Sequence, residues 1–196
     1  MNHRQLDAIR EVANIGAGHA ATALSGMTDL RVMISVPRVE WVARARAPGP
    51  STGEPDRVVI SVPVMGGDGE GRERAALILA RGTALRMISL LLRRRATPSG
   101  ADLGDLERST LEELGNIVCA SYVGVLGDFL RKRVMIGPPE LTFGEQPELY
   151  AGLGDGLVIE TDFTFQETHF EGVFLLHHSE LAFATLLDAL GVSELE

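Results

Sequence analysis

Residues 7–14 read Asp-Ala-Ile-Arg-Glu-Val-Ala-Asn, and an equivalent stretch begins 102 residues later in the chain. The residues that are identical at this offset include Glu11 and Glu113, and Asn14 and Asn116. Nine of the 31 aligned positions between Asp7 and Pro37 are identical without a gap. Unrelated residues of ordinary frequency would give about two identities. The sequence therefore predicts an internal duplication.

Both copies have the hydrophobic periodicity of an amphipathic helix. In the first copy the apolar residues with this spacing are Leu6, Ile9, Val12, Ala13, Ala17, Ala20 and Leu24. The opposite face carries Asp7, Glu11 and Asn14 in the first copy, and Ser109, Glu113 and Asn116 in the second. A helix face in contact with solvent varies freely, and Arg10 has indeed become Glu112. Retention of the Glu and Asn alone predicts that these two residues have a function.

The pattern Asp/Ser-x-x-x-Glu-x-x-Asn, present twice, resembles the CheC family of chemotaxis phosphatases. The neighbouring sequences Asn14-Ile15-Gly16-Ala17-Gly18 and Leu114-Gly115-Asn116-Ile117 resemble that family too. The resemblance covers nearly the whole chain and favours the two-motif CheC type over the single-motif CheX type. It implies one CheC-like domain, 1–196, made of two structural repeats at about 1–96 and 101–196.

The remaining sequence predicts strands and helices in the same order in each half. Strands are expected at 30–36, 39–45, 57–65, 75–80, 133–136, 140–143, 157–165 and 170–176, and helices at 83–95 and 180–190. A glycine-rich hairpin connection is expected at 66–71, and a break between the halves at 97–100. We therefore predict an α+β fold with a pseudo-twofold internal duplication, in which the paired motif helices pack on an antiparallel sheet.

Small residues are frequent in the motif helices, including Gly16, Gly18, Gly115 and Gly124. Glycine inside a helix costs roughly 1 kcal/mol relative to alanine, and close approach of another backbone is a sufficient reason to accept that cost. We expect both helices to press tightly on the sheet or on each other, with their Glu and Asn residues left outside.

The chemistry of the repeated pair suits the orientation of a water molecule. A carboxamide can donate one hydrogen bond to a water and accept another, and phosphoryl transfer depends mainly on positioning and charge stabilisation. By the resemblance, the substrate is the aspartyl phosphate of a CheY-like response regulator. Asn14 and Asn116 would orient the attacking water, while Glu11 and Glu113 would pair with the partner's lysine. Mg²⁺ would belong to the partner, and no cofactor or metal of the chain's own is expected.

Three questions stay open at this point. Asp7 and Ser109 lie one turn before each Glu, where they either cap or orient the motif or are plain surface residues. A non-catalytic adaptor that binds the receptor deamidase CheD is an alternative function, and the two roles can coexist in the resembled family. A flagellar switch component of the FliY-like type is a further alternative.

Composition places further limits on function. The net charge of −9 and pI of about 5.1 argue against nucleic-acid binding, which requires a basic surface. Cys119 is the single cysteine and is expected to be a buried apolar residue, which fits a reducing compartment. No charged leader precedes an apolar run and no stretch of 18 apolar residues occurs, so we expect a cytoplasmic protein without membrane insertion.

Several local patterns resemble other kinds of site. Residues 16–21 satisfy the G-x-G-x-x-A form of a dinucleotide loop, but an amphipathic helix precedes them in place of a buried strand. Asp68 and Glu70 lack the ligand spacing of an EF-hand and are expected in a solvated turn. Three of the five histidines lie close together in the sequence, His169, His177 and His178, but they lack a zinc pattern. We therefore predict no nucleotide, calcium or zinc site.

Overall fold

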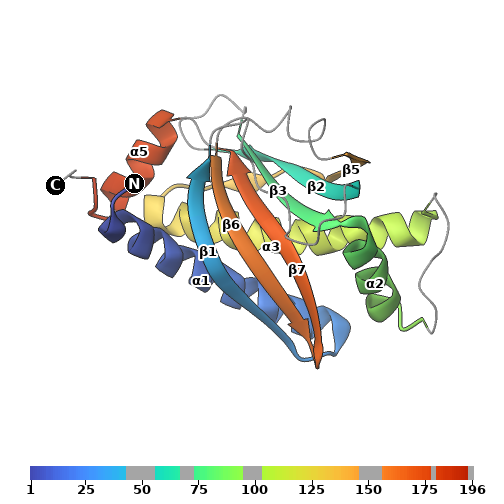
Figure 1. The fold of residues 1–196 in the computed structure, drawn as a ribbon. Helices are drawn as coiled ribbons and strands as arrows, with labels where there is room; N and C mark the ends of the chain where they lie inside the picture. The colour runs from blue at the N-terminus through green and yellow to red at the C-terminus, as the bar shows by residue number, and fades with distance from the viewer. Residues whose placement is uncertain (43–55, 67–72, 95–102, 146–155, 178–179, 194–196) are drawn as a thin grey trace.

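Four helices and one antiparallel sheet form the part of the chain that the computed structural model describes, which is residues 1–42, 56–66, 73–94, 103–145, 156–177 and 180–193. The helices are α1 (His3–Thr28), α2 (Arg81–Leu91), α3 (Asp105–Leu130) and α5 (Glu180–Ala189). The strands are β1 (Val32–Val42), β2 (Asp56–Met65), β3 (Arg74–Ala80), β4 (Met135–Ile136), β5 (Glu140–Glu145), β6 (Gly156–Phe165) and β7 (Thr168–His177). Figure 1 shows their arrangement.

The sheet is built symmetrically from the two halves of the sequence. Its strand order is β1-β6-β7-β3-β2-β4, and β5 also pairs with β2. The centre is the pair β3–β7. β1 of the first half pairs with β6 of the second half, and β4 and β5 of the second half pair with β2 of the first. This exchange confirms the predicted α+β class with pseudo-twofold duplication. The predicted break at 97–100 lies outside the described residues, so the repeat boundaries stay a prediction.

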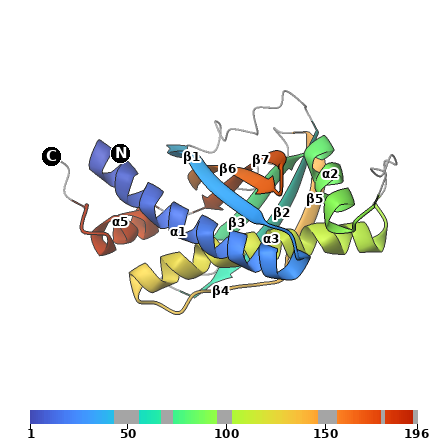
Figure 2. The same cartoon turned by 90° about the horizontal axis from the view of Figure 1, so that it is seen from below.

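The two long helices obey the same offset as the sequence repeat. α1 begins at His3 and α3 at Asp105, and each helix has 26 residues. Figures 1 and 2 show both helices on one face of the sheet, running in opposite directions. The main hydrophobic core lies between them and the sheet. A smaller group of seven buried apolar side chains lies on the other face, contributed by strands including β2, β6 and β7.

The first strand differs from the prediction. We expected separate strands at 30–36 and 39–45, but β1 is continuous and has a register irregularity between Ser35 and Arg38. Pro37 lies at this irregularity, and β1 is an edge strand of the sheet. Proline has no N–H to donate, so an edge strand with a bulge can include it without losing a ladder hydrogen bond.

The boundaries of α2 also differ from the prediction. α2 covers Arg81–Leu91 instead of 83–95, because Arg93 adopts a left-handed φ of 52° that ends the helix. Gly191, with a φ of 68°, follows the end of α5 as expected. Most of the predicted hairpin connection at 66–71 lies outside the described residues.

Glycine packing accounts for part of the predicted close approach. A Cβ at Gly16 would lie 2.8 Å from Cδ1 of Tyr122, which makes this glycine the point where α1 and α3 cross. A Cβ at Gly115 would lie 2.3 Å from Cγ2 of Ile60 on β2. Gly18 and Gly124, in contrast, have no neighbouring atom within 4 Å of such a Cβ. Internal packing explains the first two glycines and leaves the other two unexplained.

The variant Gly115→Ala is expected to unfold at a lower temperature than the wild type. Ile60 is fully buried and β-branched, so relieving the clash should cost about 1–3 kcal/mol, more than the helix propensity gained from alanine. Gly124→Ala is the matched control on the same helix and should raise stability by up to about 1 kcal/mol. Thermal unfolding measures both, at roughly 2–4 °C per kcal/mol for a chain of this size. Shifts in the same direction would contradict the packing argument.

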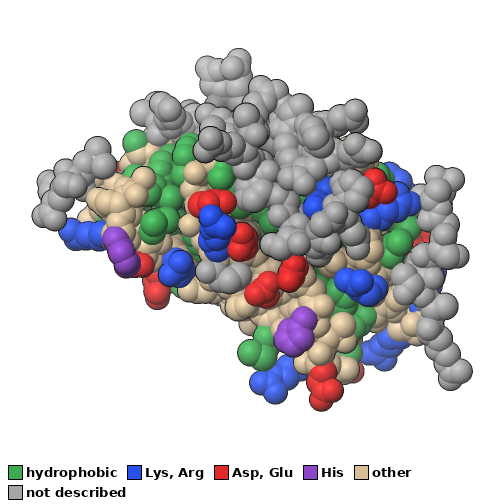
Figure 3. Space-filling view, in the orientation of Figure 1, with side chains coloured by type: hydrophobic (Ala, Val, Ile, Leu, Met, Phe, Trp, Pro, Cys, Tyr) green, Lys and Arg blue, Asp and Glu red, His purple; other side chains and the backbone are tan. Residues whose placement is uncertain are grey.

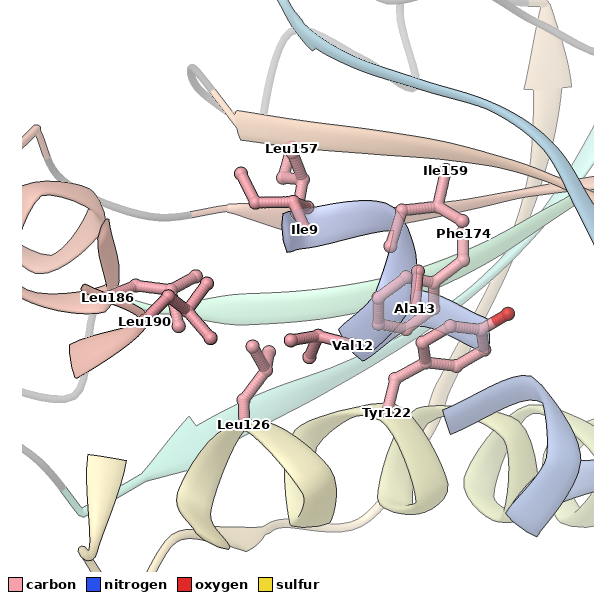
Figure 4. Close-up of a pocket in the computed structure, with 10 residues that line it drawn as sticks. All are labelled: Ile9, Val12, Ala13, Tyr122, Leu126, Leu157, Ile159, Phe174, Leu186 and Leu190. Atoms are coloured by element: carbon pink, nitrogen blue, oxygen red, sulfur yellow. The ribbon is translucent and has the colours of Figure 1, made fainter. Parts of the chain in front are cut away.

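The C-terminal helix closes one end of the core. Leu186 of α5 and Leu190, which follows the helix, approach Val12 of α1 and Leu126 of α3 around a cavity of about 10 Å³ (Figure 4). Such a volume holds about one water molecule, so this is a packing defect and no ligand site. Gln5 also donates its side-chain N–H to the Val192 carbonyl oxygen at 3.1 Å. The start of α1 is thereby joined to the residues that follow α5.

Candidate functional site

The beginning of α1 is well defined by its capping residues. The Asn2 side chain accepts a hydrogen bond from the Gln5 amide at 2.9 Å, and the Gln5 side chain accepts one from the Asn2 amide at 3.0 Å. This reciprocal capping box satisfies two amides of the first turn. α3 begins after Gly104 without a side-chain cap. The negative charges of Asp105 and Glu107 in its first turn interact favourably with the positive N-terminal end of the helix dipole.

The Glu and Asn side chains of both motifs are on the outside of the molecule. Glu11, Asn14 and Glu113 are exposed, and Asn116 is half-buried. Within the described residues, none of the four makes a hydrogen bond or ion pair through its side chain. We call Asp7, Glu11 and Asn14 the α1 face, and Ser109, Glu113 and Asn116 the α3 face. Both faces are therefore available to a partner molecule.

Asp7 and Ser109 do not cap their helices. Asp7 lies in the second turn, exposed, with Oδ2 at 2.9 Å from Nδ1 of the even more exposed His3. A solvated pair of this kind contributes little to stability. Ser109 is exposed, and its side chain has no partner among the described residues. The capping alternative is wrong for both residues, because capping belongs to Asn2 in α1 and because α3 begins at Asp105.

The two faces are separated along the crossed helices. The crossing lies at Gly16 and Tyr122, and both asparagines precede it in the sequence. α1 and α3 run in opposite directions (Figure 2). Because both asparagines precede the crossing in sequence, Asn14 and Asn116 lie on opposite sides of it. The fold therefore presents two separate Glu/Asn pairs in place of one composite site.

Two arginines that follow α2 make contacts at the end of α1 and in the first turn of α3. Arg93 Nη2 donates to the Thr28 carbonyl oxygen at 3.3 Å and lies 3.9 Å from an Asp29 carboxylate oxygen. Arg94 pairs with Glu107 in the first turn of α3. The hydrogen bond from Arg94 is the main cause that lowers the pKa of the Glu107 carboxyl below its usual value. These contacts fix the end of α1 and the beginning of α3.

Cys119 is a core residue, as the sequence predicts. It is fully buried in α3, and burial raises the pKa of its thiol to about 12. Burial likewise raises the pKa of Tyr122 to about 12, and its ring stacks on Phe174 at 4.4 Å between centroids. Neither group is available for nucleophilic or acid–base chemistry at neutral pH.

The native protein is therefore expected to resist a thiol reagent such as Ellman's reagent at pH 8. The Cys119 thiol should stay protonated and inaccessible, because only the thiolate reacts. Adding a denaturant should release one thiol per chain, which provides the internal control. Rapid labelling of the folded protein would contradict the burial of this residue.

The competing sequence patterns do not form sites among the described residues. Residues 16–21 lie in the middle of α1, where no strand-to-helix turn exists to hold a nucleotide phosphate. His169 is exposed on β7 and pairs with Thr164 at 3.0 Å. By strand alternation it lies on the sheet face opposite the long helices, the face shown in Figure 3. Asp68, Glu70 and His178 lie outside the described residues. Within the described ranges, no group of three potential ligands is placed to hold a metal ion.

Sequence reasoning missed the charge carried beside each motif. Arg10 and Glu112 lie four residues before the asparagines of the α1 and α3 faces, which places them within reach of the same partner group. The reversal of charge between these aligned positions was visible in the sequence, where it indicated only the free variation of a solvated face.

One helix has the length and composition of a membrane span. An 18-residue window of α3 has a mean hydropathy of 1.2, and half of that window is buried within the protein. A central core helix has the same properties, and α3 contacts α1, α5 and four strands of the sheet.

Comparisons with known proteins agree with the family resemblance and the fold. Residues 5–40 and 106–142, which contain both motifs, match the sequence model of the CheC-like family. The chain is similar to the CheY-P phosphatase CheC of Bacillus subtilis, with 30% identity over 147 residues that cover 72% of this chain and 68% of the relative.

Solved structures share the fold. The FliY structure from Thermotoga maritima superposes with a TM-score of 0.76 at 19% identity and covers 99% of both chains. A chain of the CheX-CheY-BeF3-Mg²⁺ complex from Borrelia burgdorferi superposes with a TM-score of 0.54 at 19% identity, covering 88% of this chain and 99% of its own length. At these identities the likeness concerns the arrangement of helices and strands.

Proposed function

This chain belongs to the CheC-like family, and from that premise we propose that it hydrolyses the aspartyl phosphate of a CheY-like response regulator. The observation that carries the proposal is the presence of two equivalent Glu/Asn pairs on exposed helix faces, without partners among the described residues. A phosphatase that acts on another protein needs such protruding side chains, because the reacting phosphoryl group belongs to the partner.

The division of labour within each pair follows from their chemistry. Asn14 and Asn116 each hold a water molecule and direct it in line at the phosphorus atom. Glu11 and Glu113 pair with the partner's lysine and fix the docked orientation. Orientation of one water is sufficient for a large effect, because a 100-fold acceleration corresponds to about 2.7 kcal/mol.

The metal ion in this proposal belongs to the partner. The Borrelia burgdorferi complex contains CheY, BeF3 and Mg²⁺, which supports a partner of the CheY type that brings its own ion. The residues proposed here bind and orient the partner and the water. They leave the neutralisation of the phosphoryl charge to the regulator.

The direct test measures phosphate release from a purified CheY-type regulator that is phosphorylated with a small phosphodonor in the presence of Mg²⁺. Adding the chain should accelerate release well above the regulator's own rate. The matched control adds the chain together with an unphosphorylatable regulator that carries asparagine at its phosphorylation site. Decay at the regulator's own rate would reject the phosphatase function.

Two non-catalytic functions of a cytoplasmic protein would use the same exposed helices. One is an adaptor for the receptor deamidase CheD, and the other is a flagellar switch component, which the fold shared with FliY makes worth testing. Both predict binding without accelerated phosphate release. A pulldown with CheD and with switch proteins, run beside the release assay, separates these functions from hydrolysis.

A further inference from the structure

The two motif faces carry opposite charges at equivalent positions. Arg10 is exposed on α1, and Glu112 is half-buried at the aligned position of α3. Each lies four residues before the asparagine of its face, a spacing that places Cβ atoms about 5–6 Å apart on a helix. Within the described residues, neither side chain makes a hydrogen bond or an ion pair. Both charges are therefore unneutralised and face the same side as the asparagines.

The other charged residues in the same helical turns increase the difference in charge between the α1 face and the α3 face. Between residues 3 and 14 of α1, two arginines balance two carboxylates, and the formal charge is zero with His3 neutral. Between residues 105 and 116 of α3, four carboxylates oppose a single arginine, and the formal charge is −3. Arg94 from the end of α2 offsets one of these carboxylates by pairing with Glu107.

The single arginine of this part of α3 does not compensate for Glu112. The Cζ atom of Arg108 lies 5.6 Å from the centroid of the Phe143 ring on β5, and Arg81 of α2 lies over the same ring at 5.8 Å. This cation is therefore held against the sheet beside α3. The position aligned with Arg108 in α1 is Leu6, so the first half has no equivalent contact.

We infer that Arg10 and Glu112 are specificity-determining residues that sort phosphorylated partners between the two faces by charge. The α1 face receives a response regulator with an acidic surface around its phosphoryl group, and the α3 face receives one whose surface there is neutral or basic. This inference rests on the proposed phosphatase function. A unit charge about 6 Å from a doubly charged group in water changes affinity by roughly tenfold, so one residue is sufficient for sorting.

The test uses single-site variants that isolate each face. Asn116→Ala leaves only the α1 face active, and Asn14→Ala leaves only the α3 face active. With an acidic CheY-type regulator, kcat/KM of the α1-only protein should fall several-fold between low and high salt, since attraction is screened. The value for the α3-only protein should stay constant or rise, since repulsion is screened.

A reciprocal exchange provides the decisive control. Arg10→Glu combined with Glu112→Arg keeps the net charge of the chain and should exchange the salt dependences of the two faces. Because the charge at position 10 changes by two units, kcat/KM at the α1 face should fall about a hundredfold in low salt. Glu171→Arg on the opposite sheet face should leave both dependences unchanged. Thermal unfolding of each variant confirms that it is folded.

The outcomes separate this inference from the proposed function. Identical salt dependences for two faces that both hydrolyse the phosphate would overturn charge sorting and leave the phosphatase intact. Dependences of reversed sign would overturn the assignment of the acidic partner to α1. Absence of hydrolysis by the wild type at any salt concentration would overturn the phosphatase function, and charge sorting with it.

Discussion

Replacing both Asn14 and Asn116 with alanine is expected to reduce accelerated phosphate release to the regulator's own rate. Each face orients its own water, and loss of one carboxamide should slow hydrolysis at that face about 100-fold, or about 2.7 kcal/mol. A single replacement should leave the other face working, because the two pairs lie on opposite sides of the helix crossing. The measurement is steady-state phosphate release with kcat and KM resolved separately.

The expected change is in kcat, because the oriented water matters in the transition state and contributes little to docking. A matched control is the double variant His19→Ala and Ser121→Ala, which are aligned positions on the same helices but turned away from the motif faces. This control should retain full activity. Full activity of the double asparagine variant would show that water is oriented by other groups.

Most of the fold could be predicted from the internal duplication of the sequence. Periodicity alone predicted both long helices, and the offset of 102 residues relates α1 to α3 down to their final residues. The pairing of β1 with β6, and of β4 and β5 with β2, was beyond sequence reasoning. Strand partners that are far apart in the chain depend on packing over the whole sheet, which local patterns do not record.

The candidate site, too, could be predicted only in part from the sequence. Exposure of Glu11 and Asn14 followed from the apolar stripe on the other side of α1, since one helix face must meet the core. The charge of each face was harder to recognise. Arg10 and Glu112 can act on a partner only if they are unpaired and lie on the same side of the helix as the asparagines, and pairing is known only from the structure. The sequence also could not distinguish between the glycines. A Cβ at Gly16 would clash with Tyr122, while a Cβ at Gly18 would have no neighbouring atom within 4 Å among the described residues.

Replacing both Glu11 and Glu113 with glutamine is expected to raise KM about 30-fold while kcat changes little. The proposed pair with the partner's lysine is a charged hydrogen bond worth about 2 kcal/mol, and each 1.4 kcal/mol corresponds to a factor of ten in affinity. Glutamine keeps the size and the helix propensity of the side chain, so the fold should be unaffected. Steady-state kinetics over a range of phosphorylated regulator concentrations measures the change.

The separation of KM from kcat distinguishes docking from chemistry. A charge pair that forms equally in the ground state and the transition state lowers KM without raising kcat. Glu171→Gln, an exposed carboxylate on the sheet face away from α1 and α3, is the control and should leave both constants unchanged. If the double glutamine variant loses kcat at an unchanged KM, the carboxylates act on the water or the phosphoryl group itself. The assignment of docking to Glu and of chemistry to Asn would then be wrong.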